Sequence, residues 1–226
     1  MPPVPPLYAH DPFLLVQHAL GRPWLDPVMA ALTIACEGWA MVLVGAAFVG
    51  WRERRLRESV RPFLTACLAL LLAGAVIHWL KPILDTPRPL AVYGPALVHV
   101  QLEPLFGGGF PSGHSASAAA LAFFALARYG ARAWPLLVLA FLGGVSRVYV
   151  GAHWVLDVLG GWTVGALCGT VAAPTVEAML RGVRWARARR GEGSAPGGGG
   201  RKMEALGQPE VVALDPKAEP VDGKRP

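Results

Sequence analysis

The stretch PVMAALTIACEGWAMVLVGAAFVG, residues 27–50, is apolar except for a single charged side chain, Glu37. An α-helix of about 20 apolar residues crosses a hydrocarbon core about 30 Å thick, so this stretch predicts a membrane span. The rest of the 226-residue chain is similar, because 54% of the residues are hydrophobic and only 16% are charged. Soluble domains carry about 25% charged residues. The composition therefore excludes a disordered chain, a small disulfide scaffold and an ordinary soluble enzyme.

Four more apolar runs follow the first one, and each predicts a further helix across the membrane. They cover residues 62–81, 114–129, 134–150 and 154–180. Residues 12–20 (PFLLVQHAL) are apolar but too few to cross, so they predict an interfacial helix near the N-terminus. We therefore expect an all-α, polytopic membrane bundle of about five transmembrane helices plus this N-terminal helix, in one domain of residues 1–190.

Arginine clusters between and after these runs predict the orientation of the chain. They occupy residues 52–61, 128–132 and 181–190. Five spans place all three clusters on one side of the membrane, and the positive-inside rule makes that side cytoplasmic. The loop of residues 82–113 and the turn before His153 then face outward. Residues 191–226, rich in Gly, Pro and charge, predict a flexible cytoplasmic tail.

A first polar cluster ends the second apolar run, in the segment KPILDTPRP of residues 81–89. Lys81 and Arg88 are its two cations, and three prolines stiffen the backbone around them. A rigid segment that aims an ammonium and a planar guanidinium at one point suits an anion such as phosphate. Taken alone, the segment also fits a snorkelling lysine beside an ordinary loop arginine.

A second cluster, GGGFPSGHSASAAA at residues 107–120, leads directly into an Ala-rich helix. Small residues ahead of a helix expose backbone N–H groups, and a helix N-terminus carries about half a positive charge. Ser112 is placed to cap this helix or to donate its hydroxyl to an oxyanion. Turn chemistry alone explains most of this pattern, but His114 is placed to deliver a proton, which favours a chemical site.

A third cluster lies in SRVYVGAHWVLD, residues 146–157. His153 and Asp157 are four residues apart, so on a helix they share a face and can hydrogen-bond. A carboxylate that holds one imidazole nitrogen leaves the other nitrogen free as a base or a nucleophile. Arg147 precedes a turn at Gly151 that can return its side chain to the same place. The alternative is a structural His–Asp pair beside a polar cavity.

Together these clusters resemble the three-part signature of the type-2 phosphatidic acid phosphatase superfamily, which also includes the vanadium haloperoxidases. That signature reads Lys-x6-Arg-Pro, then Pro-Ser-Gly-His, then Ser-Arg-x5-His-x3-Asp. Every position is filled in the correct order, by Lys81, Arg88, Pro89, Pro111, Ser112, Gly113, His114, Ser146, Arg147, His153 and Asp157. The likeness is close over residues 81–157 and only general in the apolar runs on either side.

The resemblance implies a catalytic mechanism. His153 is the expected nucleophile and forms a phosphohistidine, Asp157 holds its other ring nitrogen, and His114 acts as general acid and then as base. The phosphoryl oxygens are expected to bind Lys81, Arg88, Arg147, Ser112 and the N–H of Gly113. Three fixed cations supply the charge that a metal supplies elsewhere, and the outer loop has too few carboxylates for a hard-cation cage. We therefore expect no cofactor and no metal.

A membrane enzyme with such a site near the outer interface is expected to act on a lipid phosphate or diphosphate whose tail stays in the bilayer. Undecaprenyl diphosphate is the first expectation, followed by phosphatidylglycerol phosphate, phosphatidic acid and a lipid A phosphate. Membrane lipids are the expected partners, and nucleic acid is not. A haloperoxidase is disfavoured because those relatives are soluble. A transporter that binds a lipid phosphate in the same cationic pocket without turnover is the alternative from another functional class.

Overall fold

The computed structural model describes residues 6–102 and 104–189. Within these residues every regular element is a helix, which confirms the expected all-α class. The chain divides into two compact units, Met1–Trp185 and Ala186–Pro226, and the fold and site below belong to the first. The expected tail, residues 191–226, lies outside the described residues.

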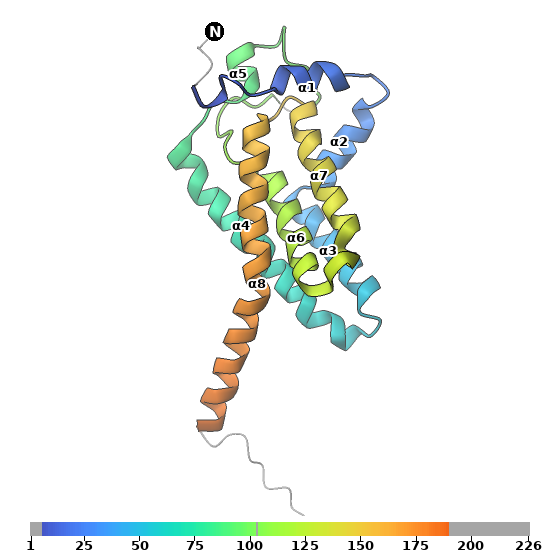
Figure 1. Cartoon of the computed structure of the whole chain (residues 1–226), viewed down its shortest axis with the longest axis vertical. Helices are drawn as coiled ribbons and strands as arrows, with labels where there is room; N and C mark the ends of the chain where they lie inside the picture. The colour runs from blue at the N-terminus through green and yellow to red at the C-terminus, as the bar shows by residue number, and fades with distance from the viewer. Residues whose placement is uncertain (1–5, 103, 190–226) are drawn as a thin grey trace, which may run out of the picture. The chain divides into compact units, whose positions relative to one another are not determined.

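The helices follow the apolar runs along the chain (Figure 1). They are η1 (Pro6–Tyr8), α1 (Phe13–Leu20), α2 (Asp26–Ala35), α3 (Gly38–Arg52), α4 (Leu56–Leu84), α5 (Pro89–Tyr93), α6 (Gly113–Tyr129), η2 (Gly130–Ala133), α7 (Trp134–Tyr149) and α8 (Val155–Arg189). The expected N-terminal helix is α1, and the last four expected spans correspond to α4, α6, α7 and α8. Leu and Ala dominate α4 and α6, and both residues have high intrinsic helix propensity.

The first apolar run forms two helices instead of the expected one. α2 and α3 meet at Cys36 and Glu37 with a bend of 78° between them. Glu37 has an extended backbone (φ −63°, ψ 149°) as the N-cap residue of α3, and its carboxylate accepts a hydrogen bond from the Trp39 indole. A charged group inside the hydrocarbon core costs free energy. The carboxylate of Glu37 avoids this position, because the break places it beside a cavity described below.

The expected number of five spans is not confirmed. By length and composition, three helical runs among the described residues can cross a membrane: Leu56–Tyr93, Gly113–Tyr149 and Val155–Val183. The bent pair of α2 and α3 makes a fourth if the two helices form one span.

The run Gly113–Tyr149 turns back on itself at η2, where Gly130 has a φ of 61° that favours glycine. His114 at the start of α6 and Arg147 near the end of α7 line one cavity. A straight helix would separate these two residues by about 50 Å. α6 and α7 therefore pack side by side as an antiparallel hairpin (Figure 1).

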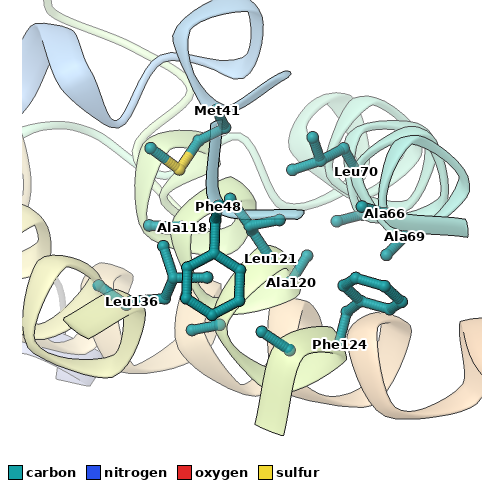
Figure 2. Packing of buried hydrophobic residues seen from close by; sticks show 14 of the residues in the cluster. Met41, Phe48, Ala66, Ala69, Leu70, Ala118, Ala120, Leu121, Phe124 and Leu136 are labelled. Atoms are coloured by element: carbon teal, nitrogen blue, oxygen red, sulfur yellow. The ribbon is translucent and has the colours of Figure 1, made fainter. Parts of the chain in front are cut away.

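α6 lies in the middle of the hydrophobic core, where Leu121 and Phe124 pack among side chains of α3, α4 and α7 (Figure 2). α8 packs on α6 through glycines at every fourth position. A Cβ atom added to Gly165 would lie 2.2 Å from the carbonyl oxygen of Ala116, and Gly161 and Gly169 make equally close approaches to the α6 backbone. Small residues thus let the two helices touch along their backbones. The contact fixes the start of α6 against the start of α8.

The first two arginine clusters lie at the opposite end of the bundle. Arg128 near the end of α6 pairs with Glu53, which follows α3, at 3.2 Å. The hydroxyl of Tyr129 donates to the same carboxylate at 3.1 Å. Arg57 and Arg61 line a cavity of about 560 Å³ beside this pair. The basic end of the bundle is therefore separate from the end where the polar clusters meet.

Candidate functional site

Three segments that are far apart in the sequence meet through backbone contacts at one end of the bundle. The backbone N–H of Ser112 donates to the carbonyl of Asp157 at 2.9 Å, which joins the second polar cluster to the third. The indole N–H of Trp154 donates to the carbonyl of Pro87 at 2.8 Å, which joins the third cluster to the first. These contacts hold the side chains of all three clusters within one region.

His153 is buried, with 1% of its surface exposed, and both of its ring nitrogens have a partner. Nδ1 lies 3.1 Å from Oδ2 of Asp157, and Nε2 lies 3.3 Å from Nη1 of Arg88. His153 precedes α8 and Asp157 is in its first turn, so the pair meets at a helix start and not within a helix as expected. A carboxylate on Nδ1 places the hydrogen there and leaves the lone pair on Nε2.

The carboxylate of Asp157 is fully buried and is itself held by two further donors. Oδ1 accepts from the Tyr8 hydroxyl at 2.7 Å, and Oδ2 accepts from the backbone N–H of Trp154 at 3.1 Å. Burial raises the pKa of the Tyr8 hydroxyl well above its usual value, so this group stays a donor. The Tyr8 ring also stacks on Trp154 with 4.6 Å between centroids. The N-terminal segment therefore orients the carboxylate that holds His153.

Arg88 is 6% exposed, and backbone carbonyls fix its guanidinium against the ring of His153. Nε donates to Gly107 at 2.8 Å, Nη1 to Ala152 at 2.9 Å and Nη2 to Gly108 at 3.3 Å. The two glycine carbonyls come from the start of the second cluster. The planar fork of arginine suits this set of acceptors, so its position is determined before any ligand arrives.

Arg147 and Lys81 bring two more cations to the same region. Arg147 is 4% exposed, and its buried Nε has no hydrogen-bond partner among the described residues. Burial lowers the pKa of His153 well below its usual value, and the charges of Arg88, Arg147 and Lys81 lower it further. The imidazole is therefore neutral at pH 7. A neutral imidazole among cations, beside a spare N–H donor, is an arrangement that can receive an anion.

His114 is the second residue of α6, and its side chain is 27% exposed. Its Nε2 lies 3.7 Å from Oε1 of Glu37, the residue at the break between α2 and α3. Both side chains line a cavity of about 250 Å³ together with Thr33, Ile34, Leu102, Leu105, Arg147, Val150 and Ala152. Polar groups therefore share this cavity with aliphatic side chains, as a ligand with a polar head and an apolar tail requires.

Ser112 is fully buried and caps α6, which is one of its two expected roles. Its Oγ accepts from the backbone N–H of Ser115 at 3.4 Å and from the Ser115 hydroxyl at 2.9 Å. Both contacts use the Ser112 oxygen as acceptor, so its hydroxyl hydrogen is still able to donate. Gly113 begins α6, and backbone N–H groups in a first helical turn have no partner within the helix.

Three residues that support the site were not predicted as part of it. Tyr8 lies 149 positions from Asp157, and no spacing rule connects them. Asp11 accepts hydrogen bonds from the first backbone N–H groups of α8 at 3.2 and 2.9 Å. Trp154 directly follows His153 in the third cluster but was not among the expected site residues. Asp11 lies just before α1, and an aspartate in that position predicts at most a cap for the helix that follows it. Nothing in the sequence indicates that Asp11 contacts the start of α8 instead.

Comparison with known proteins places these residues within a described family. The model of the PAP2 superfamily matches residues 62–180, a range that contains all eight expected site residues. The undecaprenyl-diphosphatase BcrC of Bacillus subtilis (strain 168) is 30% identical over 147 residues, which cover 64% of this chain and 72% of that protein. Phosphatidylglycerophosphatase B of the same strain is 30% identical over 162 residues, or 65% and 72% of the two chains.

Two solved structures share the fold. The crystal structure of Aquifex aeolicus LpxE matches with a TM-score of 0.60 and 25% identity, over 72% of this chain and 92% of that chain. The first transmembrane PAP2 type phosphatidylglycerolphosphate phosphatase from Bacillus subtilis matches with a TM-score of 0.51 and 24% identity, over 74% and 85%.

Proposed function

The chain belongs to the PAP2 superfamily, and from this premise we propose that it hydrolyses a lipid phosphate or diphosphate with His153 as nucleophile. It is a multi-pass membrane protein, as both its long apolar helices and its relatives indicate. The observation that carries the proposal is the pair of contacts on His153. Asp157 at 3.1 Å directs the lone pair to Nε2, and the fixed guanidinium of Arg88 lies 3.3 Å from that nitrogen.

In the first half of the reaction, Nε2 of His153 attacks phosphorus in line with the leaving oxygen. The N–P bond forms as the P–O bond breaks, and the electron pair of the broken bond stays on the leaving oxygen. Protonated His114 gives its proton to that oxygen. The products are a phosphohistidine and a lipid alcohol, or a lipid monophosphate when the substrate is a diphosphate. Asp157 stabilises the positive charge that develops on the ring.

In the second half, water attacks phosphorus on the phosphohistidine. His114 is now neutral and takes a proton from this water as the new O–P bond forms. The N–P bond breaks, and its electron pair returns to Nε2 of His153. Inorganic phosphate leaves, and both histidines are again in their starting protonation states.

The charge that develops on phosphorus is balanced by cations of the protein. Phosphoryl transfer spreads negative charge over three equatorial oxygens, so positioning and electrostatic stabilisation supply most of the catalysis. Lys81, Arg88 and Arg147 supply three positive charges, and the hydroxyl of Ser112 and the N–H of Gly113 supply neutral donors. We infer from this donor set that hydrolysis needs no metal.

The membrane setting and the cavity beside His114 support the proposed substrate class. That cavity combines Arg147 with aliphatic side chains, which suits a phosphate attached to an apolar chain. The two curated relatives are named for undecaprenyl diphosphate and phosphatidylglycerophosphate. Undecaprenyl diphosphate is the first candidate, ahead of phosphatidylglycerol phosphate, phosphatidic acid and a lipid A phosphate. The arginines at the opposite end of the bundle support an outward-facing site, because the positive-inside rule puts arginine clusters on the cytoplasmic side.

The test is release of inorganic phosphate from these four lipids by the purified protein in detergent, with and without a chelator. We expect release from at least one lipid at a rate that the chelator does not change. His153→Ala is expected to abolish it, while Glu58→Gln at the opposite end is expected to keep the full rate. Equal, background release by the wild type and His153→Ala would favour a lipid-phosphate transporter that binds in the same pocket.

A further inference from the structure

Glu37 has no role in the mechanism above, yet it occupies a defined place beside the site. It is the N-cap residue of α3, at the 78° break between α2 and α3, and its backbone is extended. The indole N–H of Trp39 donates to Oε2, which holds one carboxylate oxygen. The other oxygen, Oε1, points to Nε2 of His114 across 3.7 Å. The carboxylate is therefore oriented by its neighbour and turned toward the imidazole.

The charges around His114 make this contact important. Arg147 on α7, Lys81 on α4 and Arg88 before α5 are the cations that act on this ring, and His153 lies across the site from it. Cations disfavour a protonated imidazole, but a general acid must be protonated before it can act. Among the described residues that line the cavity, Glu37 is the only acid. Asp157 is already engaged with His153 and Tyr8.

We propose that Glu37 is a positioning residue that orients His114 and favours its protonated form. This inference rests on the proposed function, because it assigns Glu37 a role through the general acid of that reaction. Glu37 itself gives and takes no proton in this role. The proton moves from His114 to the leaving oxygen, and the carboxylate then favours the return of a proton from the hydrolytic water. The break between α2 and α3 is thus the structural feature that supplies the acid with its counter-charge.

The first test compares Glu37→Gln, Glu37→Asp and Glu58→Gln. On a lipid phosphate, Glu37→Gln is expected to lower kcat about tenfold, with a small change in KM. A tenfold fall is expected if the protonation equilibrium of the His114 imidazole changes by a factor of about ten. The alkaline limb of its kcat profile is expected to move to lower pH. Glu37→Asp keeps the charge and should recover part of the loss. Glu58→Gln removes the same charge from an exposed pair with Arg55 and should change nothing.

A double variant separates an effect through His114 from a general effect of charge. In a His114→Ala background, Glu37→Gln is expected to cause no further loss, because the group through which it acts is gone. A further tenfold loss in that background would overturn the proposal. So would an unchanged pH profile in Glu37→Gln.

A measurement without turnover keeps this proposal distinct from the proposed function. Histidine-selective 15N labelling follows the protonation of the ring directly, with the His114 signal assigned from its loss in His114→Ala. Its titration midpoint is expected to lie at lower pH in Glu37→Gln than in the wild type. An equal midpoint would contradict the inference even if the protein is an active phosphatase. A shifted midpoint would support the pairing even if no lipid tested is hydrolysed.

Discussion

His153 and His114 belong to the same site, but the surrounding chain holds them in different ways. His153 is 1% exposed, and each ring nitrogen has a partner within 3.3 Å. The side chain of His114 is 27% exposed, and its Nε2 lies 3.7 Å from the carboxylate of Glu37 at the wall of a cavity. A nucleophile must meet phosphorus at a fixed angle, whereas an acid must exchange protons with water between turnovers. The difference in burial therefore matches the difference in proposed role.

Replacing Asp157 tests the rigid side of this comparison and should have the largest effect. Asp157→Asn keeps the shape but offers no charge to Nδ1, so the ring is free to adopt the wrong tautomer. We expect kcat to fall about 10³-fold or more, by analogy with the carboxylate of a catalytic triad. Phosphate release measures it, and circular dichroism checks that the helices remain. A loss below tenfold would mean that Asp157 does not orient His153.

Replacing His114 tests the exposed side and should have the next largest effect. His114→Ala removes the proton donor, and we expect about a 10²-fold loss with a lipid alcohol as leaving group. An aryl phosphate with a good leaving group needs less protonation, so its loss should be clearly smaller. The rates of phosphate release from the lipid phosphate and from the aryl phosphate are measured on the same preparation of each variant. Equal losses on both substrates would show that His114 does not act as the acid.

Replacing Tyr8 tests whether the N-terminal segment supports the nucleophile. Tyr8→Phe keeps the ring stacked on Trp154 but removes the hydrogen bond to Asp157. A hydrogen bond to a charged group contributes about 1.5–3 kcal/mol, and we expect about a tenfold loss of kcat when part of this is lost in orienting the carboxylate. Tyr93→Phe is the matched control, since Tyr93 packs at the edge of Trp154 without contacting Asp157. Equal rates for Tyr8→Phe and Tyr93→Phe would contradict the proposed support.

Acidification should have the smallest effect. Burial and the neighbouring cations lower the pKa of His153, so its neutral, nucleophilic form persists below the usual histidine value of about 6.5. Between pH 7 and pH 6, kcat/KM for an aryl phosphate is therefore expected to fall less than about twofold. A titration of activity with a midpoint near 6.5 would indicate a hydrated, unshifted nucleophile.

The parts of the molecule that could be predicted are those encoded over short distances. Apolar runs gave the helices α4, α6, α7 and α8 because period and length are local properties. The spacing of His153 and Asp157 likewise indicated their contact. The convergence of the three clusters came from the family resemblance, since no local pattern brings Arg88 to His153.

The parts that could not be predicted depend on contacts across the fold. Residues 27–50 have the composition of one straight span, but the chain breaks at Glu37, whose side chain lines the cavity beside His114. Tyr8 reaches Asp157 because the N-terminal segment packs over the start of α8, which the sequence does not reveal. His153 also lies just before α8 and not within a helix as expected, because the composition of a segment determines poorly where a helix starts.

The identity of the nucleophile is tested most directly by trapping the phosphoenzyme. Protein incubated with a 32P-labelled lipid phosphate and denatured in alkali should retain label, because a phosphohistidine is stable in alkali and labile in acid. Peptide mapping is expected to place the label on His153, with none in His153→Ala. More label is expected in His114→Ala with an aryl phosphate, since the group that activates water is missing. Label on another residue, or turnover by His153→Ala at the wild-type rate, would contradict the proposed mechanism.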